Sequence, residues 1–323
     1  METMSTRKAR SPLRSPLLAL AVGVTAILTL AGCSTAAGES SSNTPPTSTP
    51  GGSEGVAFNQ EIHDQLPEAI RSSGAIQLGI TIGDPPYMDK VGGEYVGLIP
   101  DLADAVSTVL GVDFEYVEMP FPGLIPAIQS GKIQAVWTSM FDNADREQVI
   151  DMASYAKANM GIIVQKGNPK GIEDLDDLCG TVAGTTKGTV QEATLVEQQK
   201  KCQADGEPEL TVKLYATQND AYTQAQAGVL DSVMLTYTPM NYQVAHIEDG
   251  NAFDIIDWTS PAGYLAVGAA NTEDGLVEAI NAALLQLAAS GDYQRIMTEH
   301  GADADILSEE LLVVNGRTSG VLE

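Results

Sequence analysis

The feature that most restricts the fold is a regular alternation of short β-like runs with helical runs. Strands are predicted at residues 76–80, 113–117 and 133–137, and helices are predicted between them at 98–110 and 124–129. Parallel strands need a crossover connection, which is usually a helix. This order therefore predicts right-handed crossovers and an α/β domain whose parallel sheet is covered on both faces.

A second cycle of the same kind follows. Further strands are predicted at 161–165, 180–184, 212–215, 232–235 and 263–267, and further helices at 172–178, 190–201, 220–228, 275–290 and 293–299. Two similar α/β lobes with a late return strand predict a bilobal fold. A cleft between two lobes is a default place for a small-molecule site.

The first 32 residues have the pattern of a secretory signal peptide. Four basic residues between positions 7 and 14 precede an apolar run at 17–30, which is too short for a spanning helix. The run closes with Leu-Ala-Gly before Cys33. This arrangement resembles the bacterial lipobox, which implies that Cys33 is acylated and becomes the first residue of the mature chain. The alternative is an ordinary signal peptide that happens to carry a cysteine.

Residues 33–58 are predicted to be a lipidated, disordered tether. From Ser34 to Gly55 the chain is almost entirely Ser, Thr, Pro, Gly and Ala, with Glu39 and Glu54 as its only charges. Such a segment cannot bury enough apolar surface to offset its ordering entropy. A flexible coil of this length spans roughly 25 Å. We expect it to hold a folded part, beginning at about Asn59, just off a membrane surface.

Charge and composition exclude some partners. The chain has 43 acidic and 17 basic residues, a net charge of −26. Removing residues 1–32 takes away four basic residues and one acidic residue, which leaves −29. Nucleic-acid binding needs a basic footprint, so no nucleic-acid partner is expected. Docking on anionic lipid is disfavoured for the same reason. An apolar content of 43% is that of an ordinary soluble protein.

The other two cysteines, Cys179 and Cys202, form an even pair in a chain expected in an oxidising compartment. We expect a disulfide that closes a loop of about 24 residues. Two buried free thiols and a metal pair are the alternatives. The three histidines have no ligand spacing with the cysteines, so no metal is expected. No cofactor is expected either.

One stretch carries a family resemblance. Residues 121–135, FPGLIPAIQSGKIQA, resemble the signature of polar amino-acid-binding proteins, the family 3 solute receptors of ABC importers. Supporting segments occur in the expected order at 85–87, 98–104, 110–112, 145–147, 188–192, 230–233 and 291–293. The resemblance covers residues 66–301. The surroundings of Cys179 and Cys202 also resemble an actinobacterial branch that has a paired cysteine.

The resemblance implies a type II periplasmic-binding-protein fold, in which two α/β lobes are joined by two hinge strands with the ligand cleft between them. The implied boundaries are 59–163 and 264–316 for lobe 1, 164–263 for lobe 2 and 317–323 for a tail, with hinges near Gln165 and Gly263. Ligand binding would close the lobes, and the closed form would dock on an ABC permease. The implied protein is a monomer, lipid-anchored to the outer face of the cell membrane.

The resemblance also assigns ligand-binding roles. Arg146 falls where the family grips the ligand carboxylate, and a guanidinium fork suits that anion; the alternative is a surface helix partner. Phe121 matches the aromatic residue that stacks on the ligand, unless it belongs to the core. Thr138 and Ser139 lie in the loop that meets the carboxylate. Thr189 is placed at a helix N-terminus that favours an anion, unless it is simply an N-cap.

The chain departs from the family at further candidate positions. The acidic residue that holds the ligand ammonium is replaced by Thr236, followed by Tyr237, and a hydroxyl residue is replaced by Phe141. The aromatic residue three positions before Tyr87 is Asp84. Tyr87 and Asp84 are counted as ligand-binding candidates. Asp84 replaces the lost acid in our favoured hypothesis of a cationic ligand; alternatively, it is a turn residue before proline.

Four aromatic residues, Trp137, Phe141, Tyr237 and Tyr264, are a candidate box for a quaternary or guanidinium group. Most such residues belong to the core, and this is the alternative.

Three function classes follow. The first, which we favour, is a non-catalytic receptor that delivers a carboxylate-bearing solute, an amino acid or a derivative, to a permease. The second is an enzyme on the same fold, with Asp84, Asp142 and Lys187 as the cleft groups, although no nucleophile–base pair is visible. The third is a sensor that passes its closure to a signalling partner.

Overall fold

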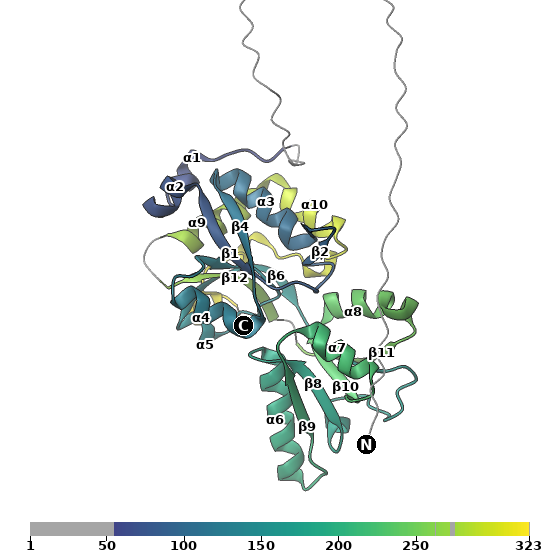
Figure 1. Ribbon diagram of the computed structural model, residues 1–323. Helices are drawn as coiled ribbons and strands as arrows, with labels where there is room; N and C mark the ends of the chain where they lie inside the picture. The colour runs from purple at the N-terminus through teal and green to yellow at the C-terminus, as the bar shows by residue number, and fades with distance from the viewer. Residues whose placement is uncertain (1–54, 262, 272–274, 323) are drawn as a thin grey trace, which may run out of the picture. The chain divides into compact units, whose positions relative to one another are not determined.

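The computed structural model describes residues 55–261, 263–271 and 275–322 of the 323-residue chain. In this part the strands form two five-stranded sheets and a two-stranded hairpin (Figure 1). The predicted signal peptide, Cys33 and most of the predicted tether lie outside the described residues. No helix within the described ranges is long and apolar enough to cross a membrane.

The first sheet has the strand order β4-β1-β5-β12-β6. Its strands are β1 (Ala75–Ile80), β4 (Asp113–Glu118), β5 (Ala135–Val136), β6 (Ile150–Ala158) and β12 (Gly263–Ala270). β1 is parallel to both β4 and β5, whereas β12 is antiparallel to β5 and to β6. The predicted parallel arrangement of the first three strands is therefore confirmed, and the return strand β12 enters the sheet in the opposite direction.

The second sheet has the order β11-β7-β10-β8-β9. Its strands are β7 (Met160–Gln165), β8 (Val182–Thr186), β9 (Thr211–Tyr215), β10 (Ser232–Thr236) and β11 (Phe253–Thr259). β8 is parallel to β9 and β10, and β7 is antiparallel to β10 and β11. Each sheet is thus mixed: one strand, β12 in the first sheet and β7 in the second, runs opposite to the other four. Two α/β lobes of this kind are the type II periplasmic-binding-protein fold.

Both faces of the first sheet are apolar, because successive residues of a strand point to opposite faces. On β5, Ala135 packs into the larger core cluster and Val136 into a separate one. The larger cluster includes residues of α1 (Gln60–His63), α2 (Glu68–Ser73), α3 (Leu98–Leu110), α9 (Leu276–Ser290) and α10 (Asp292–Glu299). The smaller cluster includes residues of α4 (Leu124–Gln129). A short α5 (Ala144–Glu147) contacts β6.

The second sheet is covered in the same way. Ile162 and Val164 of β7 pack with α6 (Val190–Asp205), whereas Ile163 between them packs with α7 (Gln218–Gln226) and α8 (Tyr237–His246). The strict alternation along β7 places one apolar core on each side of the sheet. Figure 1 shows α6 beside β8 and β9.

Among the described residues the remaining elements are β2 (Asp89–Val91), β3 (Glu94–Val96), η1 (Phe121–Gly123), η2 (Asp176–Leu178), η3 (Ile247–Gly250), η4 (Asp303–Asp305), η5 (Glu309–Leu311) and α11 (Gly316–Ser319).

The chain passes from one sheet to the other at two adjacent points. It leaves the first sheet at Asn159, between β6 and β7, and returns between β11 and β12. Ser260 joins the two passages: its amide donates to Met160 O at 3.0 Å, its hydroxyl accepts from Met160 N at 2.8 Å, and its carbonyl accepts from Asn159 Nδ2 at 2.6 Å. The first passage therefore lies before β7, whereas we expected it near Gln165, which is the last residue of β7.

The C-terminal residues expected to be a tail pack against the first lobe. Residues 316–319 form α11, and Leu322 is buried. The Glu147 carboxylate accepts the amide of Arg317 at 2.9 Å and that of Thr318 at 2.6 Å. Amides at the start of a helix have no partner within it, so the carboxylate satisfies donors that would otherwise need water.

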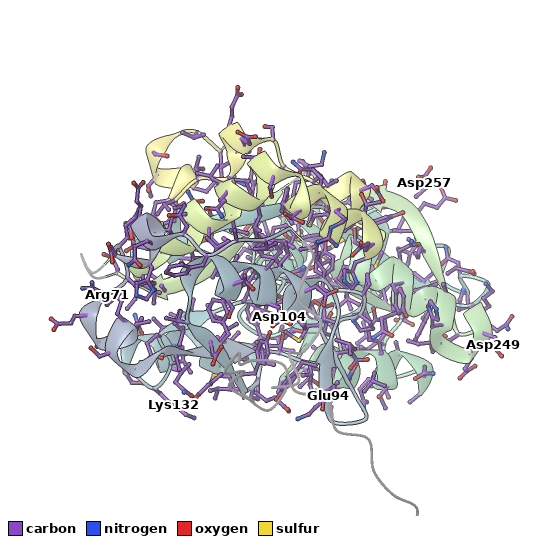
Figure 2. All side chains as sticks on the ribbon, turned by 90° about the horizontal axis from the view of Figure 1, so that it is seen from above. Arg71, Glu94, Asp104, Lys132, Asp249 and Asp257 are labelled. Carbon is purple, nitrogen blue, oxygen red and sulfur yellow. A yellow bond between two sulfur atoms is a disulfide. The ribbon has the colours of Figure 1, made fainter. Side chains whose placement is uncertain are left out.

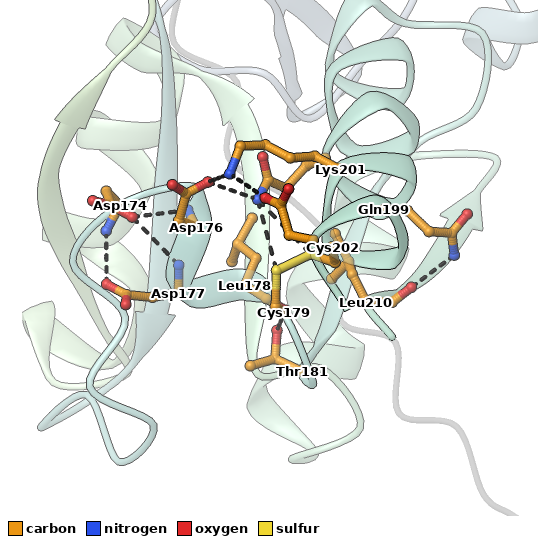
Figure 3. The surroundings of a disulfide bond; sticks show 12 residues. Asp174, Asp176, Asp177, Leu178, Cys179, Thr181, Gln199, Lys201, Cys202 and Leu210 are labelled. Atoms are coloured by element: carbon orange, nitrogen blue, oxygen red, sulfur yellow. Dashed lines mark hydrogen bonds and ion pairs between the residues drawn. A yellow bond between two sulfur atoms is a disulfide. The ribbon is translucent and has the colours of Figure 1, made fainter. Parts of the chain in front are cut away.

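The predicted disulfide between Cys179 and Cys202 is confirmed (Figure 3). It joins the residue that follows η2 to the buried side of α6. Beside it Asp176 accepts from Lys201 Nζ at 2.8 Å and from Gln198 Nε2 at 3.1 Å. The loop before η2 is thus fixed to α6 by covalent and polar contacts.

The helix predicted at 172–178 is reduced to the single turn of η2. Asp177 Oδ2 accepts the amides of Glu173 and Asp174, and Asp174 Oδ1 accepts the amide of Asp176 at 2.8 Å. Aspartate side chains offer the backbone an alternative to helical bonds. The concentration of acids in this segment therefore favours turns over a regular helix.

The exposed charged side chains lie at the periphery. Arg71 and Lys132 project outward from the first lobe, and Asp249 and Asp257 project outward from the second (Figure 2).

Candidate functional site

A cavity of about 320 Å³ lies where the parallel strands of both sheets end. β1, β4 and β5 run parallel, so their carboxyl ends meet at one edge of the first sheet, and those of β8, β9 and β10 meet at one edge of the second. Open α/β sheets commonly bind ligands outside the carboxyl ends of their strands. The cavity is lined by Thr81, Ile82, Asp84, Glu118, Met119, Pro120, Phe121, Thr138, Ser139, Thr185, Thr186, Thr189, Gln191, Ala216, Thr217, Gln218, Leu235 and Thr236.

The first-lobe wall is built from the residues that follow β1, β4 and β5. The Thr81 hydroxyl, one residue beyond β1, is hydrogen-bonded to the Thr138 hydroxyl, two residues beyond β5. The Thr138 carbonyl also accepts from the Tyr155 hydroxyl at 3.1 Å. These hydrogen bonds fix the segments that follow β1 and β5 relative to each other.

The second-lobe wall is rich in hydroxyl and amide groups. Gln191 Nε2 donates to Thr236 Oγ1 at 3.2 Å, and the Thr185 hydroxyl donates to Met234 O at 2.9 Å. The Thr186 hydroxyl is buried and has no hydrogen-bond partner within the part of the chain that the structure describes. A buried hydroxyl without a partner carries a free-energy cost, which a ligand group can relieve.

Two helices begin at the cavity. Thr189 is the N-cap of α6: its hydroxyl accepts from Glu192 N at 3.3 Å and donates to Thr186 O at 2.6 Å. Thr217 caps α7 in the same way, accepting from Asp220 N at 3.2 Å. The N-cap interpretation of Thr189 is therefore correct, and the same residue also lines the cavity.

Asp84 is buried on the first-lobe wall, with 2% of its surface exposed. Its Oδ2 accepts a hydrogen bond from the Ser139 hydroxyl, so these two predicted site residues are in direct contact. Burial raises the pKa of Asp84, and the side chains of Ser139 and Gln218 lower the pKa in part.

Arg146 lies behind the cavity wall and does not line the cavity. Its guanidinium donates Nη1 to Phe141 O and Nη2 to Gly188 O at 2.9 Å, and it lies 5.5 Å from the centre of the Phe121 ring. Burial lowers the pKa of Arg146 to about 10, so it stays charged at neutral pH. The side chain therefore joins α5 of the first lobe to the segment before α6 of the second.

Of the other predicted site residues, Tyr87, Phe141 and Tyr237 do not line the cavity. Tyr87 is fully buried and donates its hydroxyl to Asp305. The ring of Phe141 packs over Gly263, and that of Tyr237 over Gly161, so closely that a Cβ at either glycine would clash.

The remaining aromatic residues of the candidate box also lie elsewhere. Trp137 is fully buried, with ring centres 6.3 Å from Phe114 and 5.6 Å from Tyr155. The ring of Tyr264 faces the Arg317 guanidinium at 5.5 Å. None of the four residues of the box lines the cavity, so an aromatic cage is not formed there.

The acid–base candidates are dispersed. Lys187 is exposed and Asp142 is buried, and neither lines the cavity. Burial, followed by the charge of Glu147, raises the pKa of Asp142 to about 8, whereas Arg317 and Arg146 lower it. Within residues 55–261, 263–271 and 275–322, no group of three His, Cys, Asp or Glu side chains is placed to hold a metal ion.

Several lining residues were not predicted, including Thr81, Glu118, Thr186, Gln191 and Gln218. Each lies at the end of a strand, just beyond it or in the first turn of the next helix. That position was the available signal, because parallel strands expose their carboxyl ends at a common edge.

The sequence matches the model of the bacterial extracellular solute-binding proteins, family 3, over residues 76–303. It is 28% identical to the arginine-binding protein ArgT of Corynebacterium glutamicum, over 78% of this chain and 82% of the relative. It is 27% identical to the lysine/arginine/ornithine-binding periplasmic protein of Escherichia coli, over 76% of this chain and 92% of the relative. Among solved structures, an ancestral arginine-binding protein bound to arginine has a TM-score of 0.65 at 28% identity, covering 70% of this chain and 98% of that one.

The chain belongs to the bacterial extracellular solute-binding proteins, family 3. It is a binding protein that acts outside the cytoplasm, and its relatives give no support to the interpretation as an enzyme.

We predict that Asp142 makes the stability of the fold depend on pH. The pKa of Asp142 is about 8 in the folded protein and about 3.9 in an unfolded chain. Between these values the folded protein holds the extra proton, so the free energy of unfolding falls as the pH rises, by up to about 1.4 kcal/mol per pH unit. Urea unfolding at pH 5 and pH 8 should show a smaller fall for Asp142→Asn than for the unchanged protein. Parallel profiles would contradict the assignment.

Proposed function

We propose that the protein is the receptor of an ABC importer, which captures an amino acid or an amino-acid derivative and delivers it to a membrane permease. The observation that carries the proposal is a single cavity lined by the strand ends of both sheets. The relatives named above bind arginine or lysine and ornithine according to their names, which supports an amino acid as the ligand class. A monomeric receptor is part of this proposal.

Binding through both walls provides the mechanism of closure. A ligand that contacts residues from both sheets stabilises the arrangement in which the two walls are close, and shifts the population toward it by its differential affinity. The two adjacent passages at Asn159 and Ser260 are the hinge in this proposal, since only they connect the sheets along the chain within residues 75–261 and 263–270. The arrangement so favoured would be the one that docks on the permease.

Arg146 is the proposed carboxylate clamp. Its guanidinium is already charged and lies beside Phe121, which lines the cavity. To hold a ligand carboxylate, the guanidinium exchanges its neutral partners, the carbonyls of Phe141 and Gly188, for the anion. Such an exchange is favourable because hydrogen bonds between ionised groups are stronger than those to neutral carbonyls. Thr138, Ser139 and Thr189 complete the proposed carboxylate subsite.

We propose that Cys33 carries a lipid anchor, on the strength of the lipobox-like sequence and the polar tether that follows it. Mass analysis of the membrane-extracted protein would show acyl chains on an N-terminal Cys33; an unmodified cysteine would rule out the anchor.

The ligand class is tested by thermal shift and titration calorimetry on the purified protein with L-amino acids, betaines, opines and small sugars. We expect a carboxylate-bearing amino compound to raise the melting temperature, because a ligand at 100 times its Kd adds about 2.7 kcal/mol to the unfolding free energy. A response to sugars alone, or to none of the compounds, would contradict the proposed function.

We predict that Arg146→Ala abolishes binding of that ligand while the melting temperature of the free protein shows that the fold is kept. Arg146→Lys is the matched control: it retains the charge but lacks the planar fork, so it should restore only part of the affinity. The measurement is the Kd by calorimetry. An Arg146→Ala protein that binds as tightly as the unchanged protein would remove the carboxylate clamp.

A further inference from the structure

The cavity is acidic. None of the residues that line it is Lys, Arg or His, whereas two of them, Asp84 and Glu118, are carboxylates. Both come from the first-lobe wall. The second-lobe wall adds hydroxyl and amide side chains without a formal charge. A ligand that enters the cavity therefore meets negative charge and no cationic side chain at the lining.

Glu118 already has two partners. Its Oε1 accepts from Lys90 Nζ and from the Tyr95 hydroxyl at 2.8 Å, both from the β2–β3 hairpin. These contacts lower the pKa of Glu118, with the hydrogen bond from Lys90 as the largest cause. The charge of Glu118 is thus balanced by Lys90 within the first lobe, so a cationic group of a ligand would stabilise it little further.

Asp84 is in the opposite condition. Its side chain is almost fully buried; Oδ2 accepts from the Ser139 hydroxyl, and the only other side chain that lowers its pKa is the uncharged Gln218. Its Oδ1 has no hydrogen-bond partner among the residues that the structure describes. A buried carboxylate without a compensating cation is costly, because the protein interior does not replace the lost hydration. The raised pKa of Asp84 has the same physical cause.

The backbone fixes Asp84 in this position. Its amide donates to Met88 O at 2.9 Å, and its carbonyl accepts from Tyr87 N at 2.9 Å and Met88 N at 3.1 Å. Gly83 before it has φ +83°, and a Cβ there would come within 2.3 Å of Asn219 Nδ2. The positive φ favours glycine at this position. The carboxylate is therefore presented by a rigid turn.

We propose that Asp84 is the cation-binding group of the cavity, and that the bound amino acid places an ammonium or guanidinium group against its free Oδ1. The inference rests on the proposed function, because it assigns a role within the same ligand site. A cation at this position supplies both the missing hydrogen bond and the missing countercharge. The second-lobe lining has no carboxylate, so Asp84 selects for positive charge from the first lobe.

The test is titration calorimetry of Asp84→Asn and of the unchanged protein with three probes. L-Arginine has both an α-ammonium and a side-chain cation, L-citrulline keeps only the α-ammonium, and 5-guanidinopentanoate keeps only the guanidinium. We expect the variant to weaken arginine binding roughly 10- to 100-fold. If Asp84 holds the α-ammonium, citrulline binding weakens by a similar factor. If it holds the side-chain cation, 5-guanidinopentanoate binding weakens and citrulline binding does not change.

Asp257→Asn is the control, because it removes one negative charge from an exposed position of the second lobe (Figure 2) and should leave all affinities unchanged. The melting temperature of free Asp84→Asn reports whether the variant folds. If it does not, arginine is compared with pentanoate on the unchanged protein. Pentanoate has a carboxylate but no cation, so it should not bind, and this comparison still tests the cation requirement. An effect of Asp84→Asn below about twofold on all probes overturns the inference alone. Failure of every amino acid to bind the unchanged protein overturns the proposed function as well.

Discussion

The structure depends on the hydrogen bonds of Ser260 to the chain at Asn159 and Met160. These bonds hold the two passages between the sheets side by side. Ser260 is 7% exposed, so its polar groups must be satisfied within the protein, and both its amide and its hydroxyl face Met160. Because the chain leaves and re-enters the first sheet at one place, the carboxyl ends of the parallel strands of both sheets border a common cavity. The position of the site follows from this arrangement.

The cavity combines a rigid frame with unsatisfied polar groups. Its walls are held by strand-end contacts such as that between Thr81 and Thr138, whereas Asp84 Oδ1 and the Thr186 hydroxyl have no partner within the described ranges of the chain. Most buried polar groups in proteins are hydrogen-bonded, so such exceptions concentrate where a ligand completes them. Arg146 is the complementary case in the proposed function: its guanidinium is hydrogen-bonded to neutral carbonyls, which a ligand carboxylate would replace.

The sequence predicted the elements whose local signals agree with their environment. α3 spans Leu98–Leu110 as expected, because its apolar residues recur at helical spacing and Gly111 ends it with a left-handed residue. β6 was missed: it contains three alanines, which have low β propensity, and it is held in the sheet by its pairing with β12. α8 was missed because it begins directly at the end of β10 and has no apolar stripe of its own.

The candidate site, like the fold, was predicted only in part. Family resemblance and strand ends pointed to Asp84, Phe121, Thr138, Ser139, Thr189 and Thr236, all of which line the cavity. The orientation of individual side chains was not predictable, because it is decided by contacts between residues far apart in the sequence. Arg146 turns to Gly188, 42 residues away, and Tyr87 turns to Asp305, 218 residues away. The antiparallel entry of β12 likewise depends on a strand that returns from the end of the second lobe.

The central claim is that one small molecule is held by both lobes in the cavity at the strand ends. The most direct test is a crystal structure of the protein with the amino acid that binds it most tightly. The account predicts a ligand in contact with first-lobe residues such as Asp84 and Phe121 and with second-lobe residues such as Gln191 and Thr236. A ligand bound by residues of one lobe alone, or outside this cavity, would contradict it.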